Sequence, residues 1–306
     1  MWDFWYFFKS ETETFHVFFL NADRSLKANE EHHFSSEIGY ATTRDFISFT
    51  WIDNNVLSAR ENEWFNTSIW TGDVVKVKNG FLMYFTSRDS SVDDGFTQNI
   101  GLAYSESIGS GLWTPIPEFQ LKPFPKHYTQ KSNPDDVSIH AWRDPFLFLH
   151  EGIPHMLITA KSKDGIPGKN GCIACLRSIN NSLLKWESLP PLYYPGYYSE
   201  MEVSQVLMDK DDNYHLVFSS PPKWDFAPST SHAGGLHSVV SKSPFGFLNK
   251  TPNVLLPFAS NLYACRIIPE LDGEIVGFDP EKGGILRSGV KTNLSHANRD
   301  FSQFLF

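Results

Sequence analysis

The chain has few cysteines and no long apolar run, and each absence excludes a class of protein. Three cysteines in 306 residues are too few for a disulfide framework. The longest apolar runs, such as 81–85 and 145–149, fall far short of the roughly 18 to 20 residues that a membrane-spanning helix needs. We therefore expect a protein that folds without disulfide bonds and does not cross a membrane.

Basic residues are in the minority. Lysine and arginine number 26 against 35 aspartates and glutamates, which gives a net charge of −9 at pH 7. This balance opposes binding to phosphate backbones and to anionic lipids. Nucleic acids and membrane surfaces are therefore not expected partners.

No export signal is visible at the start of the chain. The first twenty residues contain Asp3, Lys9, Glu11 and Glu13, which interrupt the apolar core that a signal peptide requires. We expect a cytoplasmic protein, although a secreted protein whose leader had been removed would have the same sequence.

Patterns typical of metal and cofactor sites are missing. Cys172 and Cys175 lack the second cysteine pair that zinc would need, no His-Glu-x-x-His pattern occurs, and no glycine-rich phosphate loop is present. Segment 209–213 alternates oxygen ligands like a calcium loop, but Tyr214 stands where the turn glycine belongs. Segment 91–98 imitates a sialidase Asp-box without its final tryptophan. We expect buried thiols, two hairpin turns, no metal and no cofactor.

What the sequence does contain is a series of short apolar bursts. Hydrophobic residues make up 41% of the chain and aromatic residues 15%, while segments with helical periodicity are scarce. Bursts of aromatic and β-branched residues recur between clusters of Gly, Pro, Asn and Asp, which is typical of strands joined by turns. The clearest bursts are 15–20, 81–86, 145–150, 155–160 and 214–219. They predict an all-β fold.

A longer repeat spans these bursts. Similar stretches start at residues 38, 100, 172 and 235, and a fifth lies near 263–278. Spacings of 62 to 72 residues are long for a solenoid but suit four-stranded propeller blades with extended loops. We therefore predict a single five-bladed β-propeller over 1–306, with a funnel-shaped site where the innermost strands converge.

The first of three acidic motifs opens the chain. Asp3 stands between Trp2 and Trp5, and the strand period of two places Asp3 and Trp5 on the same side. One interpretation is an aromatic edge with a solvated aspartate. The other is a nucleophile on a sugar platform, because indole faces pack on the C–H surface of a sugar while a carboxylate attacks the anomeric carbon.

Two further acidic motifs lie downstream. Arg143 and Asp144 precede an apolar strand, and Glu200 and Glu202 lie on one face of another. On one interpretation these are a salt-bridged turn and a solvated strand edge. On the other, Asp144 holds sugar hydroxyls, and the two like charges raise the pKa of one glutamate so that it can act as a general acid.

In combination the motifs resemble a clan of five-bladed propeller enzymes. An opening Trp-Asp-x-Trp, a central Arg-Asp-Pro and a later Glu-x-Glu inside a five-unit β-repeat are similar to the levansucrases and invertases of glycoside hydrolase families 68 and 32. The opening looks more like the Trp-Asp-Ser-Trp of family 68 than the Asn-Asp-Pro of invertases. Segments 68–73 and 98–105 resemble the clan's Trp-Ser-Gly-Ser and Gln-x-x-x-Leu-Ala-Tyr-Ser stretches.

The resemblance implies a retaining enzyme that cleaves or transfers β-fructofuranosyl units of sucrose or a fructan without a cofactor. By position, Asp3 would be the nucleophile, Asp144 the transition-state stabiliser and Glu202 the acid/base, with Glu200 tuning Glu202. The residues that the resemblance places around the sugar are Trp2, Trp5, Trp70, Gln98, Arg143 and Glu200.

The chain also departs from the clan's pattern. Val203 and Ser204 follow Glu202, where levansucrases have an arginine and invertases a Cys-Pro pair, and Asp73 adds a charge near the funnel in place of a serine. No β-sandwich of the invertase kind is expected after the propeller. Two alternatives stay open: an inverting pentofuranosidase of the arabinanase type, and a propeller that binds sugar without cleaving it.

Overall fold

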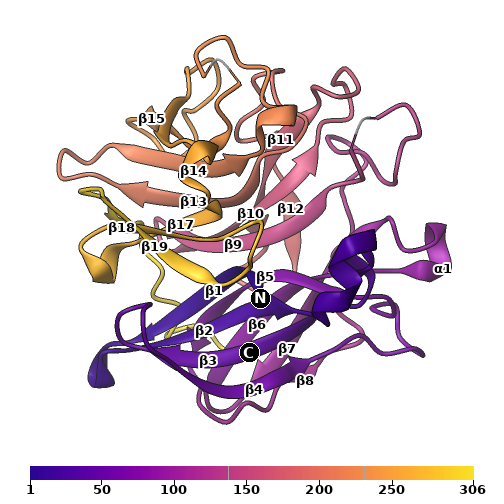
Figure 1. The fold of residues 1–306 in the computed structure, drawn as a ribbon, viewed down its shortest axis with the longest axis vertical. Coiled ribbons are helices and arrows are strands. Elements are labelled where there is room, and N and C mark those ends of the chain that lie inside the picture. Colours follow the sequence, from indigo (N-terminus) through magenta and orange to yellow (C-terminus); the bar gives the residue numbers. More distant parts are fainter. Residues whose placement is uncertain (137, 231) are drawn as a thin grey trace.

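The computed structural model describes residues 1–136, 138–230 and 232–306, without the side chains of residues 28 and 29. Over these residues the strands form five antiparallel sheets, the blades of a five-bladed β-propeller (Figure 1). The predictions of an all-β chain and of five blades are confirmed.

Each blade is a meander of strands that follow one another in the chain. Blade 1 consists of β1 (Trp2–Lys9), β2 (Thr14–Asn21), β3 (Glu37–Thr43) and β4 (Phe49–Leu57). Blade 2 consists of β5 (Ile69–Val77), β6 (Gly80–Arg88), β7 (Gln98–Ser105) and β8 (Thr114–Pro115). Blade 3 consists of β9 (Trp142–His150), β10 (Ile153–Lys161), β11 (Gly171–Ser178) and β12 (Trp186–Ser188).

Blades 4 and 5 depart from four strands. Blade 4 consists of β13 (Glu202–Met208), β14 (Tyr214–Ser220), β15 (Gly235–Ser241) and β16 (Asn253–Leu256), and β20 (Ser295–His296) adds to the inner side of β13. Blade 5 has three strands in the described part of the chain: β17 (Tyr263–Ile268), β18 (Glu274–Phe278) and β19 (Ile285–Lys291).

Helices are confined to short connections. They are α1 (Ser90–Asp93) and the 3-10 helices η1 (Ser10–Thr12), η2 (Arg24–Asn29), η3 (Glu31–Phe34), η4 (Pro222–Trp224), η5 (Phe258–Ser260) and η6 (Pro269–Leu271). Within the described residues, no helix has the length and apolar character needed to cross a membrane.

The sequence repeat marks the third strand of a blade. The stretches that start at 38, 100, 172 and 235 lie in β3, β7, β11 and β15. The fifth stretch, 263–278, does not correspond to the other four, because it covers the first two strands of blade 5 instead of its third. That third strand, β19, is mostly exposed and so lacks the apolar pattern that identifies its counterparts.

The five predicted bursts fall within β2, β6, β9, β10 and β14, as expected. Segment 209–213 is the predicted hairpin turn, in which the Asp209 carboxylate accepts hydrogen bonds from the backbone of Asp211 and Asn213. Segment 91–98 differs from a plain hairpin turn. It includes part of α1, because Asp89 caps that helical turn by accepting from the Ser91 N–H.

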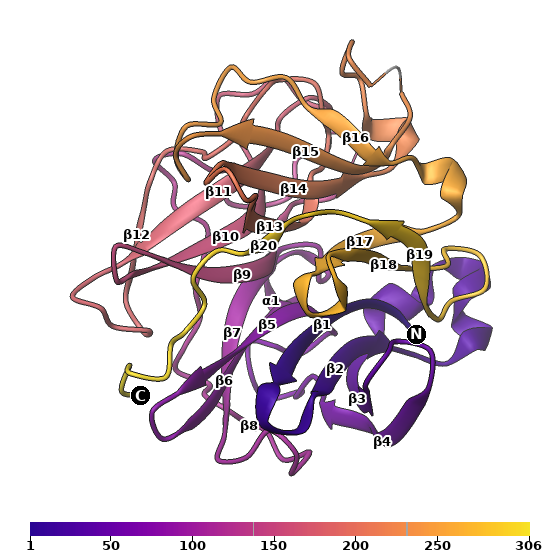
Figure 2. The same ribbon diagram turned by 90° about the vertical axis from the view of Figure 1, so that its left-hand side faces the viewer.

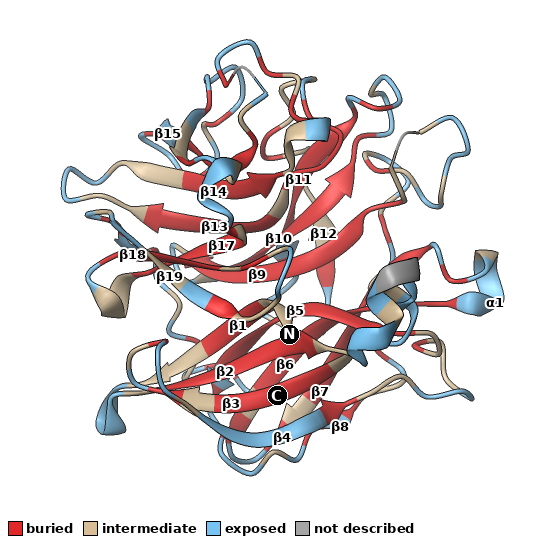
Figure 3. Ribbon diagram, in the orientation of Figure 1, coloured by how far each residue is buried: buried red, intermediate tan, exposed pale blue. Residues whose placement is uncertain are grey.

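The core lies between neighbouring blades. Buried residues colour the inner three strands of most blades, whereas β4 is an exposed outer strand (Figure 3). One cluster of buried side chains joins blades 2, 3 and 4, and another joins blades 1 and 2. Cys172 and Cys175 are buried free thiols in the first cluster, as expected.

The ring closes between blades 5 and 1 without a shared sheet. Arg266 Nε donates to Phe4 O at 2.6 Å, and Gly284 N donates to Met1 O at 2.9 Å. Residues 292–306 then leave blade 5, pass β13 at β20 and continue towards blade 2 (Figure 2). The Arg266–Phe4 bond joins the innermost strands β17 and β1, and the Gly284–Met1 bond joins the connection between β18 and β19 to the start of the chain.

Candidate active site

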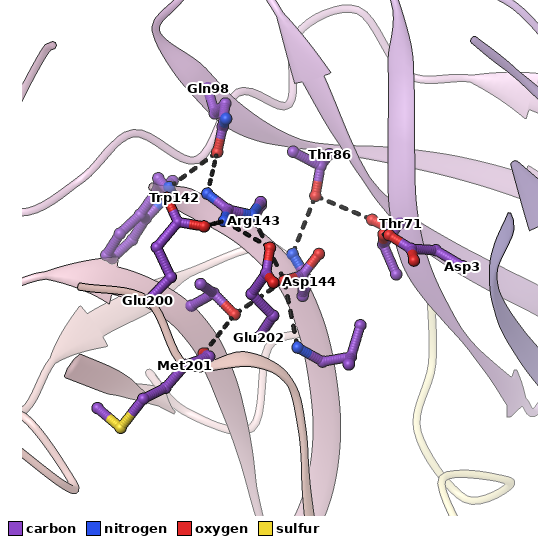
Figure 4. Close-up of polar contacts among 12 residues, drawn as sticks. Asp3, Thr71, Thr86, Gln98, Trp142, Arg143, Asp144, Glu200, Met201 and Glu202 are labelled. Atoms are coloured by element: carbon purple, nitrogen blue, oxygen red, sulfur yellow. Dashed lines mark hydrogen bonds and ion pairs between the residues drawn. The ribbon is translucent and has the colours of Figure 1, made fainter. Parts of the chain in front are cut away.

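The first strand of each blade is innermost, and the starts of these strands gather at one end of the ring. Asp3 lies near the start of β1, Asp144 near the start of β9 and Glu202 at the start of β13. Figure 4 shows their carboxyl groups converging from three different strands. Acids that are 141 and 58 positions apart in the sequence thus share one site.

Arg143 occupies the centre of this acidic cluster. Its Nη2 donates to Glu202 Oε1 at 2.8 Å and also to Glu200 Oε2, while its Nε lies 3.7 Å from Asp144 Oδ2. Gln98 Oε1 accepts from Arg143 Nη1 at 3.4 Å and so fixes the far side of the guanidinium. Burial works against the charge, but Glu200 and Glu202 hold the pKa of Arg143 above its usual value.

Asp144 is held in an unusual backbone conformation. Its φ is +58°, in the left-handed region, which costs a non-glycine residue about 1–3 kcal/mol. Its Oδ2 accepts from Thr159 Oγ1 at 2.9 Å and from Val203 N at 3.3 Å, and its own N–H donates to Thr86 Oγ1 at 3.1 Å. The first two bonds orient the carboxylate, and the third holds the backbone of Asp144.

Asp3 faces the same cluster from blade 1. Its Oδ2 accepts from Thr71 Oγ1 at 3.2 Å. Burial, followed by the charges of Asp144 and Glu202, raises the pKa of Asp3 to about 7, and the hydrogen bond from Thr71 opposes this rise. Burial likewise raises the pKa of Asp144. The site therefore concentrates carboxyl groups that bind protons more tightly than free ones.

Glu200 and Glu202 form a pair joined by one guanidinium. Burial raises the pKa of Glu200, which Arg143 opposes and the Glu202 charge reinforces. The Tyr263 hydroxyl donates to Glu202 Oε2, and burial followed by the Glu202 charge raises the pKa of that phenol well above its usual value. At neutral pH Tyr263 is thus a neutral donor to the carboxyl group of Glu202.

The tryptophans differ in their positions. Trp2 is partly exposed and meets His32 edge-on at 5.2 Å between ring centres, and Trp70 donates from Nε1 to His33 O at 2.9 Å. Trp5 is only 1% exposed and packs on Phe18 in the core between blades 1 and 2. The expectation that Trp5 lines a sugar pocket is wrong, because its indole faces are already covered.

Asp73 is not a free charge in the funnel. Arg299 Nη2 lies 2.6 Å from Asp73 Oδ1 and 2.7 Å from Oδ2, and Leu147 N donates to Oδ2 at 2.8 Å. The side chain of Asp73 is buried. The C-terminal segment supplies this arginine, which a pattern in the first hundred residues could not indicate.

Several residues of the site carry no signal in the sequence. Thr71, Thr86 and Thr159 orient the two aspartates, but isolated threonines are ordinary in strands. Tyr263 opens the fifth repeat and could have been found by asking what stands at the start of each innermost strand. His33 lies close enough for the Glu202 and Arg143 charges to act on it, and burial lowers the pKa of this histidine to about 4.

Comparison with known proteins agrees with this geometry. The model for "Glycosyl hydrolases family 32 N-terminal domain" matches residues 7–233, a range that includes Asp144 and Glu202 and starts after Asp3. No curated protein matches the sequence.

Solved structures share the fold at low sequence identity. An inulosucrase from Halalkalicoccus jeotgali bound to kestose is 19% identical, with a TM-score of 0.69 over 91% of this chain and 75% of that one. The β-fructofuranosidase catalytic domain of Microbacterium saccharophilum K-1 is 17% identical, with a TM-score of 0.64 over 96% and 76%. An endo-arabinase from Bacteroides thetaiotaomicron VPI-5482 is 13% identical, with a TM-score of 0.65 over 99% and 96%. At such identities the likeness establishes the five-bladed architecture alone.

Proposed function

The chain belongs to glycosyl hydrolase family 32, and from that premise we propose that it is a retaining hydrolase or transferase of β-fructofuranosides. The observation that carries the proposal is the convergence of Asp3, Asp144 and Glu202 on one site, in which Arg143 bonds to Glu202 and lies 3.7 Å from Asp144. Two carboxyl groups on opposite sides of a glycosidic bond are what retaining cleavage needs, and a third can stabilise the cationic transition state.

In the first half-reaction, Glu202 protonates the oxygen of the departing sugar while the Asp3 carboxylate attacks the anomeric carbon. The C–O bond to the leaving group breaks, and a fructosyl ester of Asp3 forms. Asp144, fixed by Thr159 and the Val203 N–H, would accept hydrogen bonds from two ring hydroxyls and stabilise the oxocarbenium-like charge.

In the second half-reaction, the Glu202 carboxylate removes a proton from water or from a sugar hydroxyl. That oxygen attacks the anomeric carbon, the ester bond to Asp3 breaks, and the product keeps the original anomeric configuration. Arg143 and Tyr263 both bond to Glu202 in this structure, so they stabilise its carboxylate form after it has given up its proton.

We propose sucrose or a fructan as the donor. Family membership and the partly exposed Trp2 beside Asp3 support this choice, because an indole face suits the C–H surface of a furanosyl ring. The inulosucrase that shares the fold is bound to kestose, a sugar. No cofactor takes part in the proposed reaction.

Cleavage of sucrose tests the proposal. Equal release of glucose and fructose would indicate hydrolysis, and an excess of glucose would indicate transfer. Asp3→Asn should lower kcat by at least about 10³-fold, because it removes the nucleophile. Asp53→Asn, on the exposed strand β4, serves as the matched control and should keep full activity. A wild-type protein that cleaves neither sucrose nor a fructan contradicts the proposal.

A second candidate is an inverting pentofuranosidase of the arabinanase type. The endo-arabinase match covers nearly the whole of both chains, and that observation favours it. Arabinan hydrolysis with inversion, detected by NMR of the first product formed, would favour this candidate. Sugar binding without turnover by the wild-type protein would instead favour a non-catalytic propeller.

A further inference from the structure

A cavity of about 370 Å³ lies between blades 1 and 5, and the proposed mechanism does not use it. Its volume is within the range of small-molecule sites, roughly 300–1,000 Å³. The blade 1 wall is the connection between β2 and β3, which includes η2 and η3, and the blade 5 wall is the connection between β18 and β19. Lys27 joins the two walls, because its Nζ donates to Pro280 O at 2.8 Å and to Glu281 O at 2.5 Å.

The cavity adjoins the nucleophile and the acid/base that we propose. Trp2 lines the cavity and directly precedes Asp3 in β1. Phe278, at the end of β18, lines it too and meets the Tyr263 ring edge-on at 6.0 Å between ring centres. The hydroxyl of Tyr263 donates to Glu202. One side chain therefore separates a ligand in the cavity from each of the two groups.

The lining combines aromatic rings with charges of both signs. Trp2 and Phe278 are half-buried, so neither ring is fully covered by protein. Three cationic side chains are matched by three carboxylates, and these are Arg24, Lys27 and Lys282 against Asp23, Glu30 and Asp279. Aromatic rings suit the C–H surface of a sugar, and charges of both signs suit its hydroxyl groups, which both donate and accept hydrogen bonds. The lining therefore favours a neutral, polyhydroxylated ligand over an anion.

Some of these charged groups hold the walls in shape. Asp23 caps η2 by accepting from Ser25 N at 2.8 Å, and Asp279 Oδ1 accepts from Lys282 N at 2.9 Å. Lys27 is occupied by the two backbone oxygens that it joins. These bonds fix the backbone of both walls, so the shape of the cavity does not depend on a ligand.

Three charged side chains of the cavity stay available to a ligand. Arg24, Glu30 and Lys282 are exposed, and within the part of the chain that the structure describes no hydrogen bond or ion pair engages their charged ends. Arg24 and Glu30 belong to the blade 1 wall, and Lys282 belongs to the blade 5 wall. A ligand between the walls thus has donors on both sides and a carboxylate acceptor on one.

We propose that this cavity is a sugar subsite, which binds the neutral sugar unit joined to the fructosyl group. Arg24, Glu30 and Lys282 bond to the hydroxyl groups of that unit, and Trp2 and Phe278 pack on its C–H surface. The inference rests on the proposed function, because it takes the fructosyl group to lie among the three acids. It assigns the choice of the second sugar to the junction of the first and last blades.

Kinetics with two donors test the subsite. Sucrose carries a second sugar unit, whereas methyl β-D-fructofuranoside carries a methyl group in its place. Arg24→Met combined with Lys282→Met removes the donors of both walls. Its kcat/KM for sucrose should fall by about tenfold more than its kcat/KM for the methyl fructoside, chiefly through KM. Equal losses for the two donors overturn the proposal.

Two matched variants complete the kinetic comparison. Arg24→Lys combined with Lys282→Arg keeps a donor on each wall and should restore most of the preference for sucrose. Arg44 is an exposed arginine in the connection between β3 and β4, outside the cavity. Arg44→Met should therefore keep the wild-type ratio, and a change as large as that of the double methionine variant would overturn the assignment to this cavity.

A binding measurement needs no turnover and so separates this inference from the proposed function. Calorimetry with Asp3→Asn gives the Kd of sucrose and of fructose. Adding Arg24→Met and Lys282→Met should weaken sucrose binding by about tenfold and leave fructose binding in place. Sucrose that binds equally well with and without the two cations, or that does not bind to Asp3→Asn, overturns the subsite. Cleavage of sucrose by the wild type with equal binding overturns the subsite alone.

Discussion

At the scale of a single residue, the buried carboxyl group of Asp3 shows how the site lowers the stability of the folded protein. Burial raises the pKa of its carboxyl group to about 7, and Thr71 Oγ1, at 3.2 Å, is the hydrogen-bond donor found for it in the described part of the chain. A nucleophile must be ionised, yet its surroundings disfavour the ion because water has been replaced by protein and by other carboxylates. The position that we propose for chemistry is therefore one that lowers stability.

The destabilisation caused by ionised Asp3 should appear in the pH dependence of the free energy of unfolding. The folded-state pKa of Asp3 lies above its unfolded value of 3.8, so the stabilising effect of its protonated form is full below about pH 4 and is lost as pH rises through 7. Asp3→Asn should be more stable than the wild type at pH 8, by up to about 4 kcal/mol, with the difference vanishing near pH 4. Chemical unfolding at both pH values measures it. A difference that does not change with pH contradicts the pKa shift.

At the scale of the element, the innermost strands share one irregularity. The pairing of every first strand shifts register where that strand enters the site: near Trp2 in β1, Trp70 in β5, Arg143 in β9, Glu202 in β13 and Tyr263 in β17. A bulge re-aims a side chain and leaves backbone N–H groups free to bond elsewhere. The Val203 N–H, which donates to Asp144, is an example. The bulges thus interrupt the regular pairing of the five innermost strands at the positions where these strands enter the site.

Gly72 is essential to one of these bulges. A Cβ at this position would collide with the Tyr84 carbonyl oxygen and lie 3.2 Å from the Trp5 ring. Gly72→Ala should destabilise the protein by about 1–3 kcal/mol, because backbone cannot move aside, and should reduce activity by displacing neighbouring Thr71 from Asp3. Gly109→Ala is the control, since His16 Cε1 at 4.0 Å is the sole atom near its added Cβ. Thermal unfolding of the two variants gives the comparison, and equal stability would contradict the steric argument.

At the scale of the whole molecule, residues 292–306 tie the blades together at the end opposite the acids. β20 pairs with β13 of blade 4, Asn298 O accepts from Leu149 N of blade 3 at 2.7 Å, and Arg299 binds Asp73 of blade 2. His296 Nε2 lies 2.9 Å from Glu270 Oε1, and Glu270 Oε2 accepts from the Tyr6 hydroxyl of blade 1 at 2.9 Å. One segment therefore contacts the innermost part of every blade.

Breaking the Arg299–Asp73 ion pair should show how much the C-terminal segment contributes to the free energy of unfolding. Arg299→Met leaves a buried carboxylate without its cation, which costs about 3–5 kcal/mol. Asp73→Asn combined with Arg299→Met removes both charges and should recover much of that loss. Urea unfolding of the two variants and the wild type provides the values. A double variant no more stable than Arg299→Met would show that the ion pair is not the source of the loss.

Local patterns sufficed for part of the site. The bursts of aromatic and β-branched residues indicate strands because their side chains need only alternate between two faces, and four of the five repeats follow from the same property. The acids Asp3, Asp144, Glu200 and Glu202 stand in short motifs whose residues are neighbours in the chain. Such features depend on residues that are close together in the sequence, so they can be predicted from it.

The sequence by itself determined the strand content, the number of blades and the acidic residues at the start of the innermost strands. The tertiary structure decided that Trp5 is core, that Asp73 is paired with Arg299, and that Tyr263 donates to Glu202. The physical reason is that these outcomes depend on which distant strands meet. A contact between residues 61 or 226 positions apart leaves no local periodicity from which it can be read.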